Sequence, residues 1–148
     1  MKLIFDIAEQ ADINVILDLM RQFYAHEKLP FDESTAEDAL ARLIAETTFG
    51  RIWLIKIQEK AIGYVILTLG YSIEFHGRDA FIDEIFIEAD YRGKGIGTKV
   101  IEFVELQCRE SGIHALHLEV ERENMSAQNL YRKLGFQDHD RYLMTKWV

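Results

Sequence analysis

One seven-residue segment constrains the fold more than any other: YRGKGIG, residues 91–97, in which glycine occupies every second position after Arg92. It follows the apolar stretch AFIDEIFI (80–87), typical of a buried strand, and precedes residues 95–111, whose apolar side chains recur at helical spacing. A helix N-terminus exposes unpaired N–H groups, and glycines let an anion approach them closely. The segment therefore predicts either a phosphate-binding loop or a tight turn that binds no ligand.

The glycine spacing excludes two common phosphate loops. The Walker loop needs Gly-Lys-Ser/Thr after a four-residue spacer, which this segment lacks. The dinucleotide-binding fingerprint would place its third glycine at Thr98, and it normally opens a fold, whereas this segment lies past the middle of the chain. A phosphate ligand held here would belong to another class.

The rest of the chain predicts a mixed α/β domain over residues 1–148, because no repeat, low-complexity stretch or linker divides it. Asp12 is expected to cap a first helix that ends before Pro30, and Ser34 with Glu37 to form the capping box of a second. Gly135 is expected to end the last helix. The expected strands are 2–7, 51–57, 62–69, 80–87, 116–120 and 141–148, and the later helices are 95–111 and 125–134.

Charge and cysteine content exclude several classes of partner. A net charge of −8 leaves no basic field for nucleic acid or an acidic membrane, and it is compatible with a cationic substrate. The single cysteine, Cys108, excludes an internal disulfide, lies on an apolar helical stripe and favours a reducing compartment. No apolar run approaches the ~20 residues that span a bilayer. We therefore expect a cytoplasmic protein without a membrane partner.

Two motifs in register give a specific resemblance. The pattern Arg92-x-x-Gly95-x-Gly97 after an apolar strand resembles the acyl-CoA pyrophosphate loop of the GNAT superfamily of N-acetyltransferases. The stretch NMSAQNLYRKLGF (124–136) is similar to that family's second motif and lies at the expected distance. The resemblance covers nearly the whole chain and is nearest to members that act on small amines and polyamines. It implies a mixed, mostly antiparallel sheet with a splayed pair of parallel strands, flanked by helices.

The resemblance also implies where acetyl-CoA would bind. The pantetheine would lie along the backbone of Ile85, Phe86 and Ile87. Asn124 matches a position that commonly contacts the cofactor, although asparagine is also a good helix N-cap. The pyrophosphate would be held by the loop residues Arg92, Gly93, Lys94, Gly95, Ile96, Gly97 and Thr98.

Three residues are candidates for proton transfer. Tyr131 matches the family's general acid, which protonates the departing thiolate, and the alternative is an aromatic residue on an apolar stripe. Asp83 and Glu84 interrupt an apolar strand and are candidates for the base, as is a water molecule. Neighbouring residues of a strand face opposite sides, so the two carboxylates cannot share one pocket without a bulge.

The acceptor is the least constrained part of the prediction. Tyr24, Glu27, Phe31 and Glu74 are expected to form its pocket, with ordinary surface as the alternative. A primary amine on a small cation such as a polyamine or diamine is favoured; a protein lysine, an N-terminal amine or a non-catalytic acyl-CoA-binding module are the alternatives. His114 and His117 face opposite sides of a strand, so we expect no metal. A homodimer is common in the superfamily.

Overall fold

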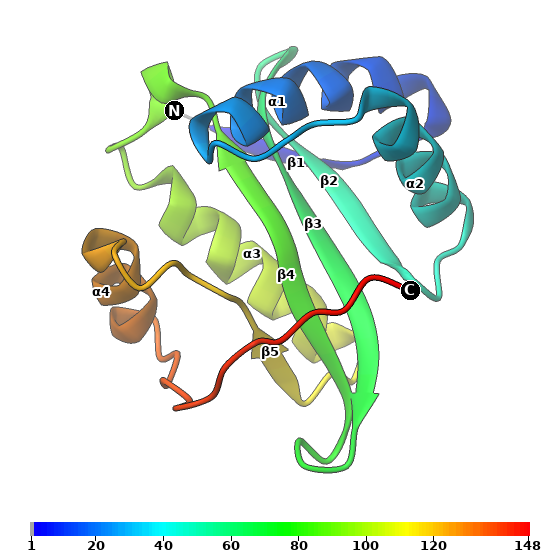
Figure 1. The fold of residues 1–148 in the computed structure, drawn as a ribbon. Coiled ribbons are helices and arrows are strands. Elements are labelled where there is room, and N and C mark those ends of the chain that lie inside the picture. The colour runs from blue at the N-terminus through cyan, green and yellow to red at the C-terminus, as the bar shows by residue number, and fades with distance from the viewer. Residues whose placement is uncertain (1) are drawn as a thin grey trace.

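The computed structural model describes residues 2–148 and places its strands in one five-stranded sheet of order β1-β2-β3-β4-β5 (Figure 1). Strands β1 to β4 pair antiparallel with their neighbours, and β5 pairs parallel with β4. The mixed, mostly antiparallel sheet expected from the sequence is confirmed. The strands are β1 (Leu3–Ile7), β2 (Gly50–Ile57), β3 (Lys60–Ser72), β4 (Gly77–Ile87) and β5 (Ala115–His117).

The parallel pair β4 and β5 stays together only briefly. Its pairing ends where Phe81 lies opposite His117, while β4 continues to Ile87. From residue 82 onward, the side of β4 that faces β5 has no strand partner within residues 2–148. The expected strand at 116–120 is correspondingly wrong in its second half, because the chain turns away from β4 after His117. The predicted splay between two parallel strands is therefore present.

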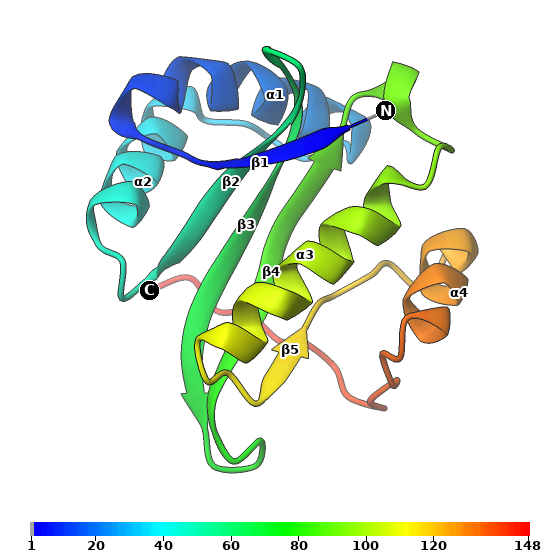
Figure 2. The same cartoon turned by 180° about the vertical axis from the view of Figure 1, so that it is seen from behind.

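Helices cover both faces of the sheet. Helices α1 (Ile13–His26) and α2 (Glu33–Ala45) lie on one face (Figure 1), and α3 (Ile96–Glu110) lies across the other (Figure 2). Helix α4 (Met125–Lys133) lies at the β5 edge beside α3. Each of α1 and α3 turns an apolar stripe toward the sheet, as their helical spacing predicts. Short 3-10 turns precede α1 and follow β4.

The helix ends depart from expectation at two positions. Asp32 is the N-cap of α2, because its carboxylate accepts a hydrogen bond from the N–H of Thr35 at 3.2 Å. The expected capping box of Ser34 and Glu37 is therefore wrong, since Ser34 already lies in the first turn. Asp12 does precede α1, but its carboxylate accepts from the N–H of Glu9 at 2.8 Å and closes the 3-10 turn instead.

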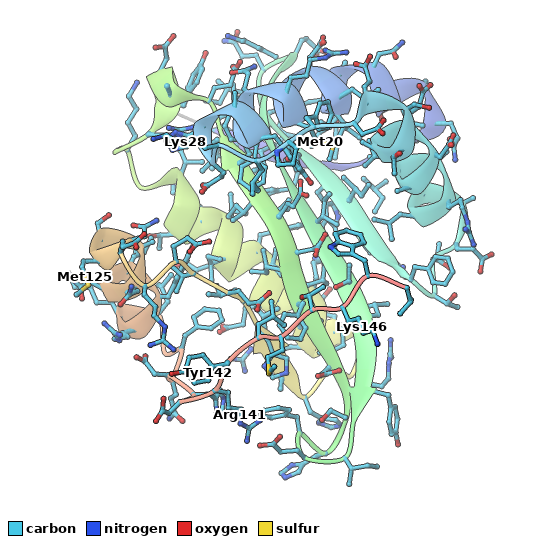
Figure 3. The ribbon with its side chains drawn as sticks, viewed as in Figure 1. Met20, Lys28, Met125, Arg141, Tyr142 and Lys146 are labelled. Atoms are coloured by element: carbon cyan, nitrogen blue, oxygen red, sulfur yellow. The ribbon has the colours of Figure 1, made fainter. Side chains whose placement is uncertain are left out.

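The C-terminal segment, residues 141–148, is not the strand that its alternation predicts. It makes no ladder with the sheet and crosses in front of it, with Arg141, Tyr142 and Lys146 along its course (Figure 3). Arg141 donates to both carboxylate oxygens of Glu74, at 3.0 and 2.7 Å, and so ties the segment to the β3–β4 hairpin. Its large apolar side chains stay exposed, because β-propensity without a partner edge does not form a strand.

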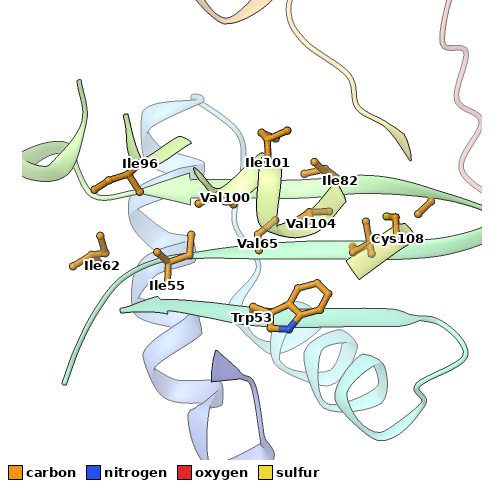
Figure 4. Close-up of a cluster of buried hydrophobic side chains, with 12 residues drawn as sticks. Trp53, Ile55, Ile62, Val65, Ile82, Ile96, Val100, Ile101, Val104 and Cys108 are labelled. Atoms are coloured by element: carbon orange, nitrogen blue, oxygen red, sulfur yellow. The ribbon is translucent and has the colours of Figure 1, made fainter. Parts of the chain in front are cut away.

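Two apolar clusters fill the spaces on either side of the sheet. The cluster under α3 contains Trp53, Val65, Val100 and Cys108 (Figure 4), and the cluster under α1 and α2 contains Tyr64 among others. Burial raises the pKa of the Cys108 thiol to about 11, so this residue is a core thiol, as expected. Among residues 2–148, none of the helices has the length and apolar character to cross a bilayer.

Candidate active site

The unpaired side of β4 presents main-chain groups to the space where β4 and β5 diverge. Alternate residues of a strand direct their N–H and C=O groups to opposite sides. The N–H of Glu88 bonds to the carbonyl of Ile62 on the β3 side at 2.8 Å, so Phe86, two residues earlier, also faces β3. Ile85 and Ile87 therefore face the open side. Phe86, expected beside them, instead uses its backbone in the sheet and its ring in the core.

The glycine loop places the first turn of α3 next to this open edge. Gly93 and Gly95 have φ values of 75° and 78°, a left-handed conformation that glycine adopts without strain. Gly95 is the N-cap of α3 and supplies no side chain to satisfy the first N–H groups, and the first turn contains no acidic residue. The N–H groups at the start of α3 are consequently available to an anion, at the positive end of the helix dipole.

The surroundings of the loop fit a phosphate group. A Cβ atom placed on Gly93, Gly95 or Gly97 would meet no atom within 4 Å beyond its adjacent residues and its own helix backbone, so the space in front of the loop is open. Arg92 does not reach into that space: its Nε donates to the carbonyl of Ile87 at 2.8 Å and its guanidinium lies 5.4 Å from the Phe86 ring. Arg92 thus fastens the loop to the end of β4. Lys94 is exposed beside the Tyr91 ring.

Helix α4 carries Asn124 and Tyr131 at the same edge of the sheet. The side-chain oxygen of Asn124 accepts from the N–H of Ala127 at 3.2 Å, so Asn124 is the N-cap of α4. Tyr131 is half-buried against the α3-side cluster and packs against Phe136, with 5.9 Å between ring centroids. Burial raises the pKa of the Tyr131 phenol, which therefore keeps its proton at neutral pH.

A β-bulge at Asp83 changes how the two neighbouring acids are placed. Ile66 lies opposite Glu84 and Leu67 opposite Ile82, so Asp83 has no partner on β3. The bulge breaks the strict alternation that would separate the two carboxylates. The charge of Asp83 adds to the burial that raises the pKa of Glu84. Burial raises the pKa of Asp83 itself.

The two carboxylates nevertheless have different surroundings. Glu84 is held by two phenols: the hydroxyl of Tyr24 donates to Oε2 at 2.5 Å, and that of Tyr64 donates to Oε1 at 2.8 Å. Burial raises the pKa of Glu84, and these hydrogen bonds oppose the rise. Asp83 makes no side-chain hydrogen bond to another described residue and is exposed to the cavity beside it. Glu84 is therefore committed to protein partners, whereas Asp83 is available to a ligand.

A cavity of about 310 Å³ lies where β4 and the chain after β5 separate. Asp83 contributes one acidic side chain to its wall and Glu119 contributes a second. Thr68, Phe81 and Ile82 complete the lining. Sequence reasoning missed Glu119, although it alternates with the apolar Leu118 and Val120; it also missed Tyr64, which resembles any other aromatic residue of a buried strand.

The residues expected to form an acceptor pocket do not all meet. Tyr24 and Phe31 lie together at the end of α1, with 5.0 Å between ring centroids, and Glu27 is exposed in the same region. Glu74 is wrong as their neighbour, because it lies in the β3–β4 hairpin at the opposite end of the sheet (Figure 1), where it pairs with Arg141. Tyr24 is thus joined through Glu84 to the strand that carries Asp83, whereas Glu74 pairs with Arg141 in the hairpin.

His117 has a structural partner. Its Nε2 lies 3.0 Å from Oδ2 of the buried Asp79 on β4, and its ring packs against Phe75 and Phe81. This contact joins β5 to β4 just before the strands diverge. Within residues 2–148, no group of three or more His, Cys, Asp or Glu side chains is arranged to hold a metal ion.

Comparison with protein families gives a match over most of the chain. The model of the family described as "Acetyltransferase (GNAT) family" matches residues 14–136. A thialysine N-epsilon-acetyltransferase from Bos taurus is 32% identical over 140 residues, which cover 88% of this chain and 82% of that protein. Both the strand–loop–helix unit and the second motif lie within the matched residues.

Comparison with solved structures gives the same fold. An integron cassette protein from the mobile metagenome of Cole Harbour Salt Marsh has a TM-score of 0.85 and 30% identity, covering 97% of this chain and 90% of that one. A predicted acetyltransferase from Clostridium acetobutylicum, solved with acetyl-CoA, has a TM-score of 0.82 and 18% identity, covering 98% and 96%. At that identity the second likeness concerns the fold alone.

Proposed function

This chain belongs to the GNAT acetyltransferase family and is an N-acetyltransferase; we propose that it transfers the acetyl group of acetyl-CoA to the primary amine of a small cation. One observation carries the proposal: the open edge of β4 leads directly into the glycine loop, with Arg92 fastening the two together. An extended chain with a thioester at one end and a pyrophosphate at the other fits such a site. The neighbouring structure solved with acetyl-CoA has the same fold, which supports this choice.

The residues would act on the cofactor in two regions. The N–H groups of Gly97 and Thr98, together with others of the loop, would hold the pyrophosphate, and Lys94 would add a positive charge. The main chain of Ile85 and the N–H of Ile87, whose carbonyl already accepts from Arg92, would hold the pantetheine and polarise the thioester carbonyl. When bound, acetyl-CoA supplies an activated acyl group on a sulfur leaving group.

Proton transfer would use two residues, Asp83 as the base and Tyr131 as the acid. Asp83 would take a proton from the acceptor ammonium, directly or through water, so that the neutral nitrogen can attack the carbonyl carbon. A C–N bond then forms and the C–S bond breaks, both in a ternary complex, and the second proton that the nitrogen loses would restore the Tyr131 phenol through water. Tyr131, whose raised pKa keeps it protonated, would donate its proton to the departing sulfur.

The choice of Asp83 over Glu84 makes a prediction about pH. Because burial raises the pKa of Asp83 and only the carboxylate can accept a proton, we expect kcat/KM to fall on the acid side of a pKa above the ordinary aspartate range. Asp83→Asn is expected to lower kcat/KM by about 10²-fold or more, with an unchanged affinity for acetyl-CoA. Initial rates between acidic and mildly basic pH measure both effects, and full activity of Asp83→Asn would contradict the assignment.

The acidic cavity supports a small cationic acceptor. Asp83 and Glu119 line it together, and the exposed ring of Phe81 offers a face to a cation. The Bos taurus relative is named for acetylation of an ε-nitrogen, which supports an amine acceptor. We therefore expect polyamines and diamines to be better acceptors than protein lysines or N-terminal amines of peptides. The rate of thiol release from acetyl-CoA, measured with each of these amines in turn, ranks them as acceptors. Faster release with peptides than with polyamines and diamines would overturn the proposal of a small cationic acceptor.

A homodimer is part of the proposal. Tyr142, Leu143, Met144 and Trp147 are between 74% and 94% exposed on one short segment, which favours an apolar contact with a second copy. Light scattering coupled to size-exclusion chromatography is expected to give twice the mass of the chain. A monomeric mass at micromolar concentration would contradict it. A cytoplasmic location, like the absence of nucleic-acid and membrane partners, stays a prediction from composition.

A further inference from the structure

Glu84 is the meeting point of three elements that border the site. Tyr24 reaches it from α1, Tyr64 reaches it from β3, and Glu84 itself directly follows the bulge residue of β4. Each carboxylate oxygen receives one phenol hydrogen bond, at 2.5 and 2.8 Å. Tyr64 has no exposed surface, so its hydroxyl has no access to bulk water. We refer to Tyr24, Glu84 and Tyr64 as the phenol–carboxylate clamp.

The clamp fixes two parts of the site at once. On β4 it immobilises the residue next to Asp83, and therefore the direction in which the bulge presents the Asp83 carboxylate. On α1 it holds Tyr24, whose ring packs against Phe31 at 5.0 Å and Phe23 at 5.4 Å. The end of α1 and the segment that follows are thereby joined to the bulge, 60 residues away in sequence, through a single carboxylate.

A carboxylate in this position is poorly suited to be the base. Both oxygens already accept a hydrogen bond from a phenol that burial and the Glu84 charge keep protonated, since these factors raise the pKa of Tyr24 and of Tyr64. A proton added to Glu84 would turn a charge-assisted hydrogen bond from a phenol into a weaker, neutral one in an apolar environment, which is unfavourable. Asp83 accepts no hydrogen bond from a phenol and borders the cavity.

We propose that Glu84 is a positioning residue, and that the phenol–carboxylate clamp aligns the Asp83 carboxylate with the acceptor-binding end of α1. The proposal rests on the proposed acetyl transfer to an amine. It assigns Tyr24 and Tyr64 a role in the geometry of the acceptor and none in binding the cofactor. Loss of the clamp should therefore change KM for the amine and leave KM for acetyl-CoA unchanged.

Two substitutions at one position separate a positioning role from a catalytic one. Glu84→Gln keeps an oxygen that accepts from one phenol and an amide that donates to the other, but it cannot take a proton at neutral pH. Glu84→Leu removes both functions. We expect Glu84→Gln to keep kcat within about tenfold of the wild-type value, and Glu84→Leu to raise KM for the amine by about tenfold or more. Equal, near-complete loss of kcat in both variants would make Glu84 the base and overturn the proposal.

The phenols provide a second test through pH dependence. Removing a hydroxyl that bonds to the charged carboxylate raises the pKa of that carboxyl group. If Glu84 were the base, Tyr64→Phe would move the acid limb of kcat/KM to higher pH. With Glu84 as a positioning residue, the limb should not move upward, and Tyr24→Phe and Tyr64→Phe should raise KM for the amine. An upward move, or unchanged KM in both variants, contradicts the clamp.

Hydrogen exchange tests the clamp without any turnover. In Glu84→Leu, amides of residues 24–31 and of residues 82–86 should both exchange faster than in the wild type, while those in Glu84→Gln should stay protected. Faster exchange in only one of the two segments, or in neither, would show that the clamp does not couple them. If the wild type transfers acetyl to no amine but the coupled exchange is present, the proposed function fails and the clamp stands.

Discussion

Gly97→Val is expected to weaken acetyl-CoA binding by about 100-fold or more. The side chain would project into the open space in front of the first turn of α3, where the pyrophosphate is proposed to lie. Loss of two charge-assisted hydrogen bonds, each worth about 1.5–3 kcal/mol, accounts for an effect of this size. Isothermal titration with CoA measures it directly, and the stabilisation of the protein by CoA against thermal unfolding should disappear in parallel.

The position is chosen so that the fold survives the substitution. Gly97 lies inside α3 without a left-handed backbone, whereas Gly95 has a φ of 78° at which valine would be strained. Glu102→Val is the matched control, because it places the same side chain on an exposed position of the same helix. If Gly97→Val were stabilised by CoA as strongly as the wild type and the control, the pyrophosphate would not lie on this loop.

Tyr131→Phe is expected to lower kcat by about 10²-fold and to leave the affinity for acetyl-CoA within a factor of about two. The ring, and with it the packing against Phe136 and the α3-side cluster, is retained. Only the proton that would reach the departing sulfur is lost. Steady-state kinetics at saturating concentrations of both substrates measure kcat, and titration with CoA measures affinity.

An exposed tyrosine outside the site provides the control for this substitution. Tyr71 is 75% exposed near the hairpin end of β3, so Tyr71→Phe should leave kcat unchanged. An unchanged kcat in Tyr131→Phe would remove Tyr131 as the acid. A loss of affinity equal to the loss of kcat would instead assign the hydroxyl to cofactor binding.

The cofactor side of the site was predictable because its signals are local. Three parts of the site are contiguous in sequence: the apolar strand 80–87, the glycine loop and the start of α3. Because the connection between strand and helix is short, the end of the strand and the start of the helix must lie close together. The two ends of α4 were likewise predictable from residue type. Asn124 is its N-cap, and Gly135 lies just after its C-terminal end with a positive φ. The family match then agrees with the resemblance that the two motifs predicted.

The acceptor side was less predictable because it depends on register and on contacts between distant segments. A bulge at Asp83 leaves no mark in the residue types of β4, since it is set by how β3 and β4 pair. The bonds of Glu84 to Tyr64 and Tyr24 span 20 and 60 residues. The placement of Glu74 was wrong for the same reason, because the length of β3 and β4 carries the hairpin away from α1.

For the C-terminal segment, residues 141–148, a local sequence pattern predicted a strand that the structure does not contain. The alternation of RYLMTKWV favours a strand, yet a strand forms only beside an edge with which it can pair. Within residues 2–148 this segment forms an ion pair with Glu74 through Arg141, and it makes no strand pairing with the sheet. Periodicity therefore predicted its β-propensity correctly and its structure wrongly.

The most direct test of the central claim is to incubate the protein with acetyl-CoA and a panel of diamines, polyamines and lysine peptides, and to identify products by mass spectrometry. We predict a product heavier than a small cationic amine by one acetyl group, formed only with acetyl-CoA present and strongly reduced with Tyr131→Phe. Tight CoA binding without acetylation of any amine in the panel would contradict the account.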